Sequence, residues 1–226
     1  MPMRWPSCRP TRRTTRGTCS TSCRSPLTFA EVARLHVPKP LPREALSRDA
    51  DVVARNLLGC HLEIREGATV RTVRIVETEA YLGEMDLACH ASKGRTARTE
   101  SMYGAPGTTY VYQVYGMHHM FNVVTSHEGD PQAVLIRAVE PLDFDARTQG
   151  PGLWTAVMGI DVSDDRKDML GGRFRLLQAP APVSILVGPR IGVDYAGAWA
   201  KAPLRFGEAG SPFLSKPFPA VPADVT

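Results

Sequence analysis

The chain has 226 residues, of which 43% are hydrophobic and 22% are charged. These values suit a globular protein with one sizeable core, and the lack of any run of about 20 apolar residues excludes a membrane-spanning helix and indicates a soluble protein. The formal net charge of +4 comes from residues 1–40, which hold eight Lys and Arg and one acid. The remainder is weakly acidic, so its overall charge gives no argument for nucleic-acid binding.

The first 40 residues differ in composition from the rest of the chain. They are rich in Arg, Ser, Thr and Pro and hold three of the five cysteines. Such a segment has little apolar surface to bury, so we expect a disordered basic tail or residues translated from upstream of the functional start. The other two cysteines, Cys60 and Cys89, are too few for a disulfide framework or a four-ligand zinc site, which favours a reducing cytoplasm.

One helix is expected at residues 47–59. Its apolar residues recur at the spacing of a single helix face, at Ala50, Val53, Ala54, Leu57 and Leu58. Ser47 or Asp49 is a suitable cap for its start, and Gly59 suits the left-handed conformation that ends a helix.

Strands dominate the chain after this helix. Residues 61–66 and 72–81 flank a Glu66-Gly67 turn and predict a β-hairpin, and a loop is expected at residues 82–107. Later strands are expected at residues 108–116, 120–126, 133–141, 173–178 and 183–188.

The remaining segments complete the predicted fold. Gly150 opens a short helix that ends near Gly159, and the chain is expected to be irregular from Pro203 onward. A helix followed by many strands with few crossovers predicts an α+β fold, a single domain with a mainly antiparallel, curved β-sheet flanked by helices.

Two carboxylates lie on one face of the longer strand of the hairpin. Glu77 and Glu79 are two residues apart, so strand alternation places them on the same side as Tyr81. Val73 and Ile75 have the same parity, so we expect this face to be partly buried and its acids to have partners. Two exposed acids on an edge strand are the alternative.

Arg137 is the expected partner of these acids. It shares strand parity with Leu135 and Val139 and is therefore expected on an apolar face. A buried guanidinium without a partner is very unfavourable, and a carboxylate is its best companion. We predict that Arg137 lies near Glu79 or near a water that Glu79 holds, and the alternative is an arginine that reaches solvent at a strand end.

Three tyrosines occupy the strand at residues 108–116. Tyr110 and Tyr112 share one face and could line a pocket, whereas Tyr115 has the opposite parity and precedes Gly116 at a hairpin tip. A bulky side chain at such a tip can push between stacked bases, which predicts a DNA-inserting β-hairpin. Ordinary strand aromatics are the alternative, because tyrosine favours strands.

The histidines do not indicate a metal site. His118 and His119 are adjacent in a strand and point to opposite faces, and no HxH, HExxH or CxxC spacing occurs. No Gly-rich phosphate loop and no GxSxG motif is present. We therefore expect neither a metal nor a cofactor.

Several motifs follow one another along the chain. The segment RIVETEAYLG is followed by His90, then by PGTTYVYQVYGM, Asn122 and LIRAVEP, and further on by GPG at 150–152 and PRIGVDYAGAWAKAPLRF at 189–206. These motifs, in this order, resemble those of the alkyladenine type of DNA-3-methyladenine glycosylase, the methylpurine DNA glycosylases. The resemblance covers roughly residues 41–216, which we expect to be the glycosylase domain, with a flexible C-terminus at 217–226.

The resemblance implies a monofunctional enzyme of base-excision repair. Such enzymes flip alkylated or deaminated purines, among them 3-methyladenine, 7-methylguanine and hypoxanthine, out of duplex DNA and hydrolyse the N-glycosidic bond. It implies that Glu79 is the general base that activates water and that Arg137 helps to hold this water. It also implies that the flipped base is sandwiched between Tyr81, His90 and Tyr112. Asn122 then forms the floor of the pocket, and Tyr115 intercalates into the DNA.

The same resemblance implies double-stranded DNA with damaged purines as the partner, no cofactor, and a monomer in the cytoplasm, associated with the nucleoid in a bacterium. Leu153 stands where the family usually has Lys, and Ala198 replaces an acid, which puts some phosphate contacts in doubt. We expect a local basic face from Lys93, Arg95, Arg98, Arg190 or Lys201.

Two other functions remain open at this point. One is a non-catalytic protein that binds damaged DNA and inserts Tyr115 as a wedge between stacked bases, but has no use for Glu79. The other is a glycoside hydrolase that uses Glu77 and Glu79 as an acid/base pair, because carboxylates about 7 Å apart suit that chemistry by distance.

Overall fold

The computed structural model describes residues 38–219, and residues 1–37 and 220–226 lie outside that range. Most of the expected tail at residues 1–40 therefore lies outside the described residues, as does the end of the C-terminal segment expected to be flexible. No helix in the described part is long and apolar enough to cross a membrane.

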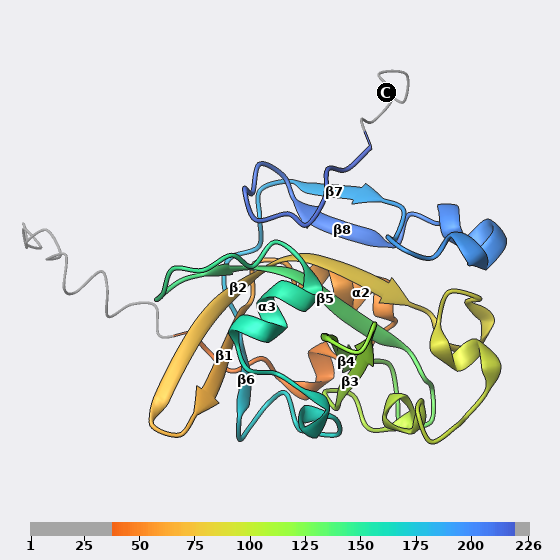
Figure 1. Ribbon diagram of the computed structural model, residues 1–226, viewed down its shortest axis with the longest axis horizontal. Helices are drawn as coiled ribbons and strands as arrows, with labels where there is room; N and C mark the ends of the chain where they lie inside the picture. The colour runs from red at the N-terminus through yellow and green to blue at the C-terminus, as the bar shows by residue number, and fades with distance from the viewer. Residues whose placement is uncertain (1–37, 220–226) are drawn as a thin grey trace, which may run out of the picture. The chain divides into compact units, whose positions relative to one another are not determined.

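A sheet of eight strands forms the framework of the described domain (Figure 1). Six strands follow the order β3-β4-β5-β2-β1-β6, and β8 pairs with both β2 and β7, always antiparallel. The strands are β1 (His61–Glu66), β2 (Thr69–Tyr81), β3 (Thr109–Val114), β4 (His118–Val124), β5 (Ala133–Pro141), β6 (Phe174–Leu177), β7 (Ile185–Gly188) and β8 (Arg205–Glu208). The predicted α+β fold with a curved, mainly antiparallel sheet is confirmed.

Short helices flank the sheet. The α-helices α2 (Ala50–Asn56) and α3 (Pro151–Val157) match the two predicted helices. The other helical turns are 3₁₀ helices, namely η1 (Arg43–Ala45), η2 (Gly83–Met85), η3 (His90–Lys93), η4 (Glu100–Tyr103), η5 (Val162–Asp164) and η6 (Asp194–Lys201). Three of these turns, η2 to η4, lie in the segment predicted as a loop.

The two ends of α2 differ in how well the sequence predicts them. Gly59 follows the helix with a φ of +85°, as the prediction of a left-handed stop requires. The predicted side-chain cap is wrong, because Asp49 occupies the N-cap position without a side-chain hydrogen bond and Ser47 donates to the carbonyl of Arg43 instead. The backbone N–H of Ala50 donates to Gln132 Oε1 at 2.8 Å, so a distant side chain replaces the local cap.

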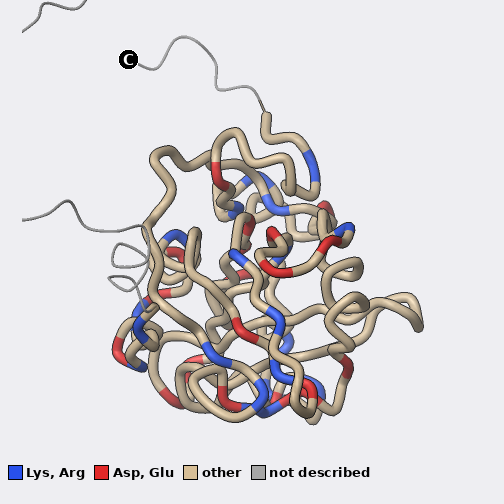
Figure 2. The backbone as a smooth tube through the Cα atoms, turned by 90° about the vertical axis from the view of Figure 1, so that its left-hand side faces the viewer, with Lys and Arg blue, Asp and Glu red and all other residues tan. Residues whose placement is uncertain are grey.

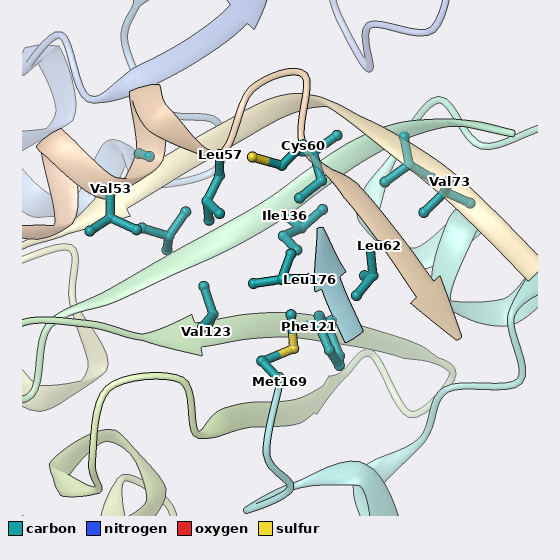
Figure 3. Close-up of a cluster of buried hydrophobic side chains, with 14 of the residues drawn as sticks. Val53, Leu57, Cys60, Leu62, Val73, Phe121, Val123, Ile136, Met169 and Leu176 are labelled. Atoms are coloured by element: carbon teal, nitrogen blue, oxygen red, sulfur yellow. The ribbon is translucent and has the colours of Figure 1, made fainter. Parts of the chain in front are cut away.

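Helices and strands meet in the largest of the hydrophobic clusters of the described residues (Figure 3). Trp154 of α3 is fully buried, its Nε1 donates to the carbonyl of Ile136 at 3.0 Å, and its ring lies 5.5 Å from that of Phe121, edge to face. Phe121 belongs to β4 and Ile136 to β5. Through these contacts, Trp154 fixes the position of β4, which carries Asn122, relative to β5, which carries Arg137.

The pairing of β2 with β5 is irregular on both sides of Glu77. Val73 and Ile75, before the irregularity, and Ala80, after it, belong to the same hydrophobic core although their parity differs. Glu79 therefore lies on the other side of the sheet from Val73 and Ile75. The expectation that these residues share one face is wrong, because the bulge shifts the alternation by one residue.

The strand β8 (Arg205–Glu208) was not expected, because the chain was predicted to be irregular from Pro203. Its four residues are too few to show an alternating pattern, and its pairing partners lie far away in the sequence. In the observed register Arg205 is opposite Glu79, and Gly207 is opposite Glu77. This pairing brings the C-terminal part of the domain next to the two carboxylates.

Candidate active site

Glu79 is fully buried near the end of β2 and has three hydrogen-bond donors. Its Oε2 accepts from the hydroxyl of Tyr81 at 3.0 Å, and its Oε1 accepts from the backbone N–H of Ile191 at 2.8 Å. Arg137 Nη1 lies 3.2 Å from the same Oε1, so the predicted contact between Arg137 and Glu79 is present. A carboxylate can only accept hydrogen bonds, and a buried one needs such partners.

Glu77 has a separate and complete set of partners on the same side of β2. Arg205 Nη1 lies 3.1 Å from its Oε1, and Arg137 Nε lies 3.4 Å away. The hydroxyl of Ser215 donates to Oε1 at 2.8 Å, and the backbone N–H of Ser215 donates to Oε2. Arg137 is therefore shared between two buried carboxylates, and Glu79 also contacts two further residues of the pocket wall, Tyr81 and Ile191.

A pocket of about 300 Å³ opens next to Glu79. Most of its wall is aromatic or apolar, and its polar groups come from a few positions on β2, β3, β4, β5 and the loop that follows β7. The predicted site residues along its lining are Tyr81, His90, Tyr112, Tyr115, Asn122 and Arg137. Glu79 does not line the pocket itself, but its three donors Tyr81, Arg137 and Ile191 do, so the carboxylate lies directly behind them.

Three rings pack together on one side of the pocket. His90 and Tyr112 meet edge to face at a centroid distance of 4.6 Å, and Tyr110 and Tyr112 lie 5.1 Å apart. The hydroxyl of Tyr110 is hydrogen-bonded to Nδ1 of His90 at 2.7 Å. The predicted shared face of Tyr110 and Tyr112 is confirmed, because their rings pack against each other on the same side of β3.

The rings of the pocket are uncharged at neutral pH. Burial, followed by the charges of Arg98 and Lys93, lowers the pKa of His90 to about 4. Burial, followed by the charge of Glu79, raises the pKa of Tyr81 well above its ordinary value, and burial raises the pKa of Tyr112 as well. The pocket therefore offers neutral aromatic walls to a ligand ring.

Asn122 is buried at the base of the aromatic cluster. Its Nδ2 donates to the carbonyls of Tyr110 at 2.9 Å and Met120 at 3.3 Å. Because these carbonyls use the amide nitrogen, the side-chain oxygen is the atom left for the pocket that Asn122 lines.

A buried ion pair supports Tyr81 and the loop after β7. Arg190 donates to both carboxylate oxygens of Asp86, at 2.8 Å to Oδ1, and to the carbonyl of Ala80 at 2.8 Å. Its guanidinium carbon lies 4.8 Å from the ring centre of Tyr81. Arg190 also precedes Ile191, whose N–H reaches Glu79. The expectation that Arg190 contributes to a basic face is wrong, because its side chain is fully buried.

Tyr115 lies at the tip of the β3–β4 hairpin, apart from the other tyrosines. Tyr115 and Gly116 both have positive φ, at 51° and 69°, as the central residues of a type I′ turn do. The side chain of Tyr115 is 91% exposed, and that of Met117 is 68% exposed. Tyr115 differs from Tyr110 and Tyr112 in its exposed position at the turn, although all three line the same pocket, and its insertion into DNA stays a prediction.

Surface charges are mixed around the described domain. In Figure 2, Lys and Arg alternate with Asp and Glu, and neither sign covers the side that faces the viewer. Lys93, Arg98 and Lys201 are exposed, whereas Arg95 is paired with Glu100 at 2.6 Å. Among the described residues there is no group of three or more His, Cys, Asp or Glu that could hold a metal ion.

Four residues of this site were missed from the sequence, namely Asp86, Ile191, Arg205 and Ser215. Ile191 acts through its backbone, which no residue-type argument can detect. Asp86, Arg205 and Ser215 contact partners more than 100 residues away. The only available signal was the segment at 189–206, where the family resemblance continues beyond the strands that carry the acids.

Known proteins match this chain over most of the described domain. A family model described as methylpurine-DNA glycosylase (MPG) matches residues 44–212. A protein of Myxococcus xanthus (strain DK1622) named as a 3-methyladenine DNA glycosylase is 50% identical over 181 residues, which cover 78% of this chain and 93% of the relative. Proteins with the same name from Legionella pneumophila (strain Lens) and Methanocella arvoryzae are 48% and 44% identical, and each match covers 79% of this chain and 99% or 97% of the relative.

Proposed function

Because the chain belongs to the methylpurine-DNA glycosylase family, we propose that residues 41–216 flip alkylated or deaminated purines out of duplex DNA and hydrolyse their N-glycosidic bond. Membership makes the protein a monofunctional DNA glycosylase, with DNA as its partner. The proposed substrates are 3-methyladenine, 7-methylguanine and hypoxanthine. The names of its relatives, which are 3-methyladenine DNA glycosylases, support the first of these. The proposed working form is a monomer in the cytoplasm, at the nucleoid in a bacterium.

The observation that carries the proposal is the position of Glu79. A buried carboxylate with three donors lies directly behind an aromatic pocket that suits one flat ring system. Ligand pockets usually have volumes of about 300–1,000 Å³, and this one is at the small end of that range, in keeping with a single base. Hydrolysis of a nucleoside bond requires a carboxylate that acts on the bond and a pocket that holds the flat base.

Recognition of the damaged base is assigned to the neutral rings. Tyr81, His90 and Tyr112 would sandwich the flipped base, and Asn122 would meet its edge at the pocket floor. An alkylated purine carries positive charge, and electron-rich aromatic faces attract a cation. A neutral His90 avoids the repulsion that an imidazolium would impose on such a ring.

Bond cleavage is assigned to Glu79 and a water molecule. The water would take the place of the Tyr81 hydroxyl at Glu79 Oε2, beside Arg137, and would pass a proton to the carboxylate as its oxygen bonds to C1′ of the sugar. The electron pair of the C1′–N bond leaves with the purine. An alkylated, cationic purine departs as a neutral base, whereas hypoxanthine departs as an anion that takes a proton from solvent water. The carboxylate also stabilises the positive charge that develops on the sugar.

Glu77 is assigned a supporting role. A general acid has to reach the leaving group, whereas both oxygens of Glu77 are occupied by Arg205, Arg137 and Ser215. This arrangement argues against a glycoside hydrolase with a Glu77–Glu79 pair. Tyr115 is assigned to the gap that a flipped nucleotide leaves in the duplex, because its exposed ring projects from a hairpin tip.

One comparison of variants tests the proposal. Duplexes that contain hypoxanthine or 3-methyladenine are incubated with the wild type, with Glu79→Gln and with Glu63→Gln as a control, and abasic sites are measured. Glu63 lies in the same sheet but outside the pocket, so the control should cleave normally. Glu79→Gln should lose cleavage and keep its affinity for the DNA. Full activity of Glu79→Gln would contradict the mechanism, and an inactive wild type that still binds the duplex would support the non-catalytic binder.

A further inference from the structure

The C-terminal segment 211–219 folds back against Glu77 and Arg137. Ser215 makes two hydrogen bonds to Glu77, one from its hydroxyl at 2.8 Å and one from its backbone N–H. The same hydroxyl accepts from Arg137 Nε at 3.3 Å. A single hydroxyl therefore bridges Glu77 and Arg137, the arginine that also contacts Glu79.

The segment is held in place by its own contacts with β7 and β8. Arg205 donates to the carbonyls of Lys216 at 3.3 Å and Pro217 at 2.9 Å. The ring of Phe218 lies 3.8 Å from the guanidinium of Arg205 and covers Gly207, where an added Cβ would come within 2.6 Å of the ring. Pro217 and Phe218 belong to the stretch that the sequence led us to expect as flexible, and here they fix the position of Ser215.

The acids compete for Arg137. Its Nη1 contacts Glu79 at 3.2 Å, and its Nε lies 3.4 Å from Glu77, so both carboxylates attract the same cation. The Ser215 hydroxyl reduces this competition in two ways, because it gives Glu77 another donor and gives Arg137 Nε a neutral acceptor. Arg137 can then keep Nη1 directed at Glu79.

We infer that Ser215 is a positioning residue of the active site, through which the C-terminal segment keeps Arg137 on Glu79. The inference rests on the proposed function, since it assigns Ser215 to the reaction of Glu79. Ser215 does not line the pocket and contacts no substrate there. Its effect therefore belongs to the chemical step and not to the binding of DNA.

Loss of the hydroxyl should change the position of Arg137. Without it, Glu77 draws Arg137 toward itself, and Glu79 keeps the Tyr81 hydroxyl and the Ile191 N–H but loses part of its contact with Arg137. The chemical step should therefore slow, whereas the affinity for DNA should not change.

The test is a single-turnover measurement on full-length variants with duplex DNA that contains hypoxanthine. Ser215→Ala removes the hydroxyl but keeps the backbone N–H on Glu77, and Ser215→Thr restores a hydroxyl. Ser211→Ala is the matched control, because Ser211 lies in the same segment and its hydroxyl accepts only from the N–H of Phe213. Phe218→Ala loosens the segment without touching either acid and serves as a second variant should Ser215→Ala fold poorly.

Ser215→Ala should lower the cleavage rate by roughly tenfold with DNA affinity unchanged, because misplacement of a reacting group by about 1 Å can cost up to about 100-fold in rate. Ser215→Thr should recover the rate, and Phe218→Ala should show the same loss of rate at unchanged affinity. A Ser215→Ala enzyme with the cleavage rate of the wild type would overturn the inference, even if it melts at a lower temperature. In that case an active wild type and an inactive Glu79→Gln would leave the proposed function standing, whereas a wild type without cleavage would refute both.

Discussion

The buried pair of Asp86 and Arg190 gives the sharpest test of the packing behind the pocket. Both side chains are fully buried, and the guanidinium has no other acidic partner among the described residues. Asp86→Ala leaves that cation buried without a counter-charge. Removal of one partner of such a pair typically costs about 3–5 kcal/mol of unfolding free energy. Domains are stable by only about 5–15 kcal/mol, so this loss is a large share of the total.

The structure indicates that the loss of unfolding free energy in Asp86→Ala lies toward the upper end of this range of about 3–5 kcal/mol. The carboxylate of Asp86 also accepts from the backbone N–H groups of Leu82 at 3.1 Å and Ala88 at 3.0 Å, and both donors lose their partner in the variant. Arg190 would also be free to move, and with it the N–H of Ile191 that reaches Glu79. The variant should therefore lose activity as well as stability.

Urea denaturation followed by tryptophan fluorescence measures the effect. The control is Asp168→Ala, because Asp168 pairs with Arg43 at 2.9 Å with both side chains more than 40% exposed. Exposed pairs typically contribute less than about 1 kcal/mol, so the control should unfold close to the wild type. The double variant Asp86→Leu/Arg190→Met removes both charges and should recover much of the loss. If Asp86→Ala lowers the unfolding free energy no more than Asp168→Ala does, the reasoning that Arg190 is left buried without a counter-charge is wrong.

Three further predictions address the wedge, the pocket and the core. Tyr115→Ala should slow excision from duplex DNA and leave excision from a single strand nearly unchanged, as single-turnover rates on the two substrates would show; an equal effect on both would contradict the wedge. Burial lowers the pKa of His90 from 6.5 to about 4, so between these pH values the folded state binds fewer protons than the unfolded state. As the pH falls through that window, the unfolding free energy of the wild type should therefore decrease relative to that of His90→Gln. A constant difference between the two proteins in urea denaturation would contradict this. Trp154→Ala should cost about 3–5 kcal/mol, because it empties a fully buried site and leaves the carbonyl of Ile136 without its donor, and a thermal midpoint close to that of the wild type would be evidence against that packing.

Strand parity predicted the part of the site that lies within single strands. Tyr110 and Tyr112 are neighbours on one face of a regular strand, as alternation predicts. Tyr115 differs from them because it follows the end of β3, in a turn where its φ is 51°. The partnership of Arg137 with Glu79 followed from the cost of burying either charge alone. These predictions succeed because they depend on local geometry or on a pairing rule that leaves few choices.

Parity failed where the backbone departs from regular geometry. The register shift around Glu77 places Val73 and Ile75 in the core and Glu79 on the opposite side, although all three are odd-numbered positions of one strand. No residue in this stretch is a glycine or proline that would have marked a bulge. The irregularity follows from pairing with two strands, β5 and β8, of which β8 itself could not be predicted.

The network around Glu77 explains why such irregular geometry persists. Two carboxylates and two arginines, Glu77, Glu79, Arg137 and Arg205, are nearly or fully buried together. Apolar residues of similar volume would often be more stable in their place, because desolvation of four charges offsets most of their attraction. Stability alone therefore gives little reason for the cluster. Its members hold one carboxylate, Glu79, in a fixed position behind the pocket, and some of their partners lie up to 138 residues apart in sequence. Such fixed placement is what the proposed activation of a water molecule by Glu79 would require.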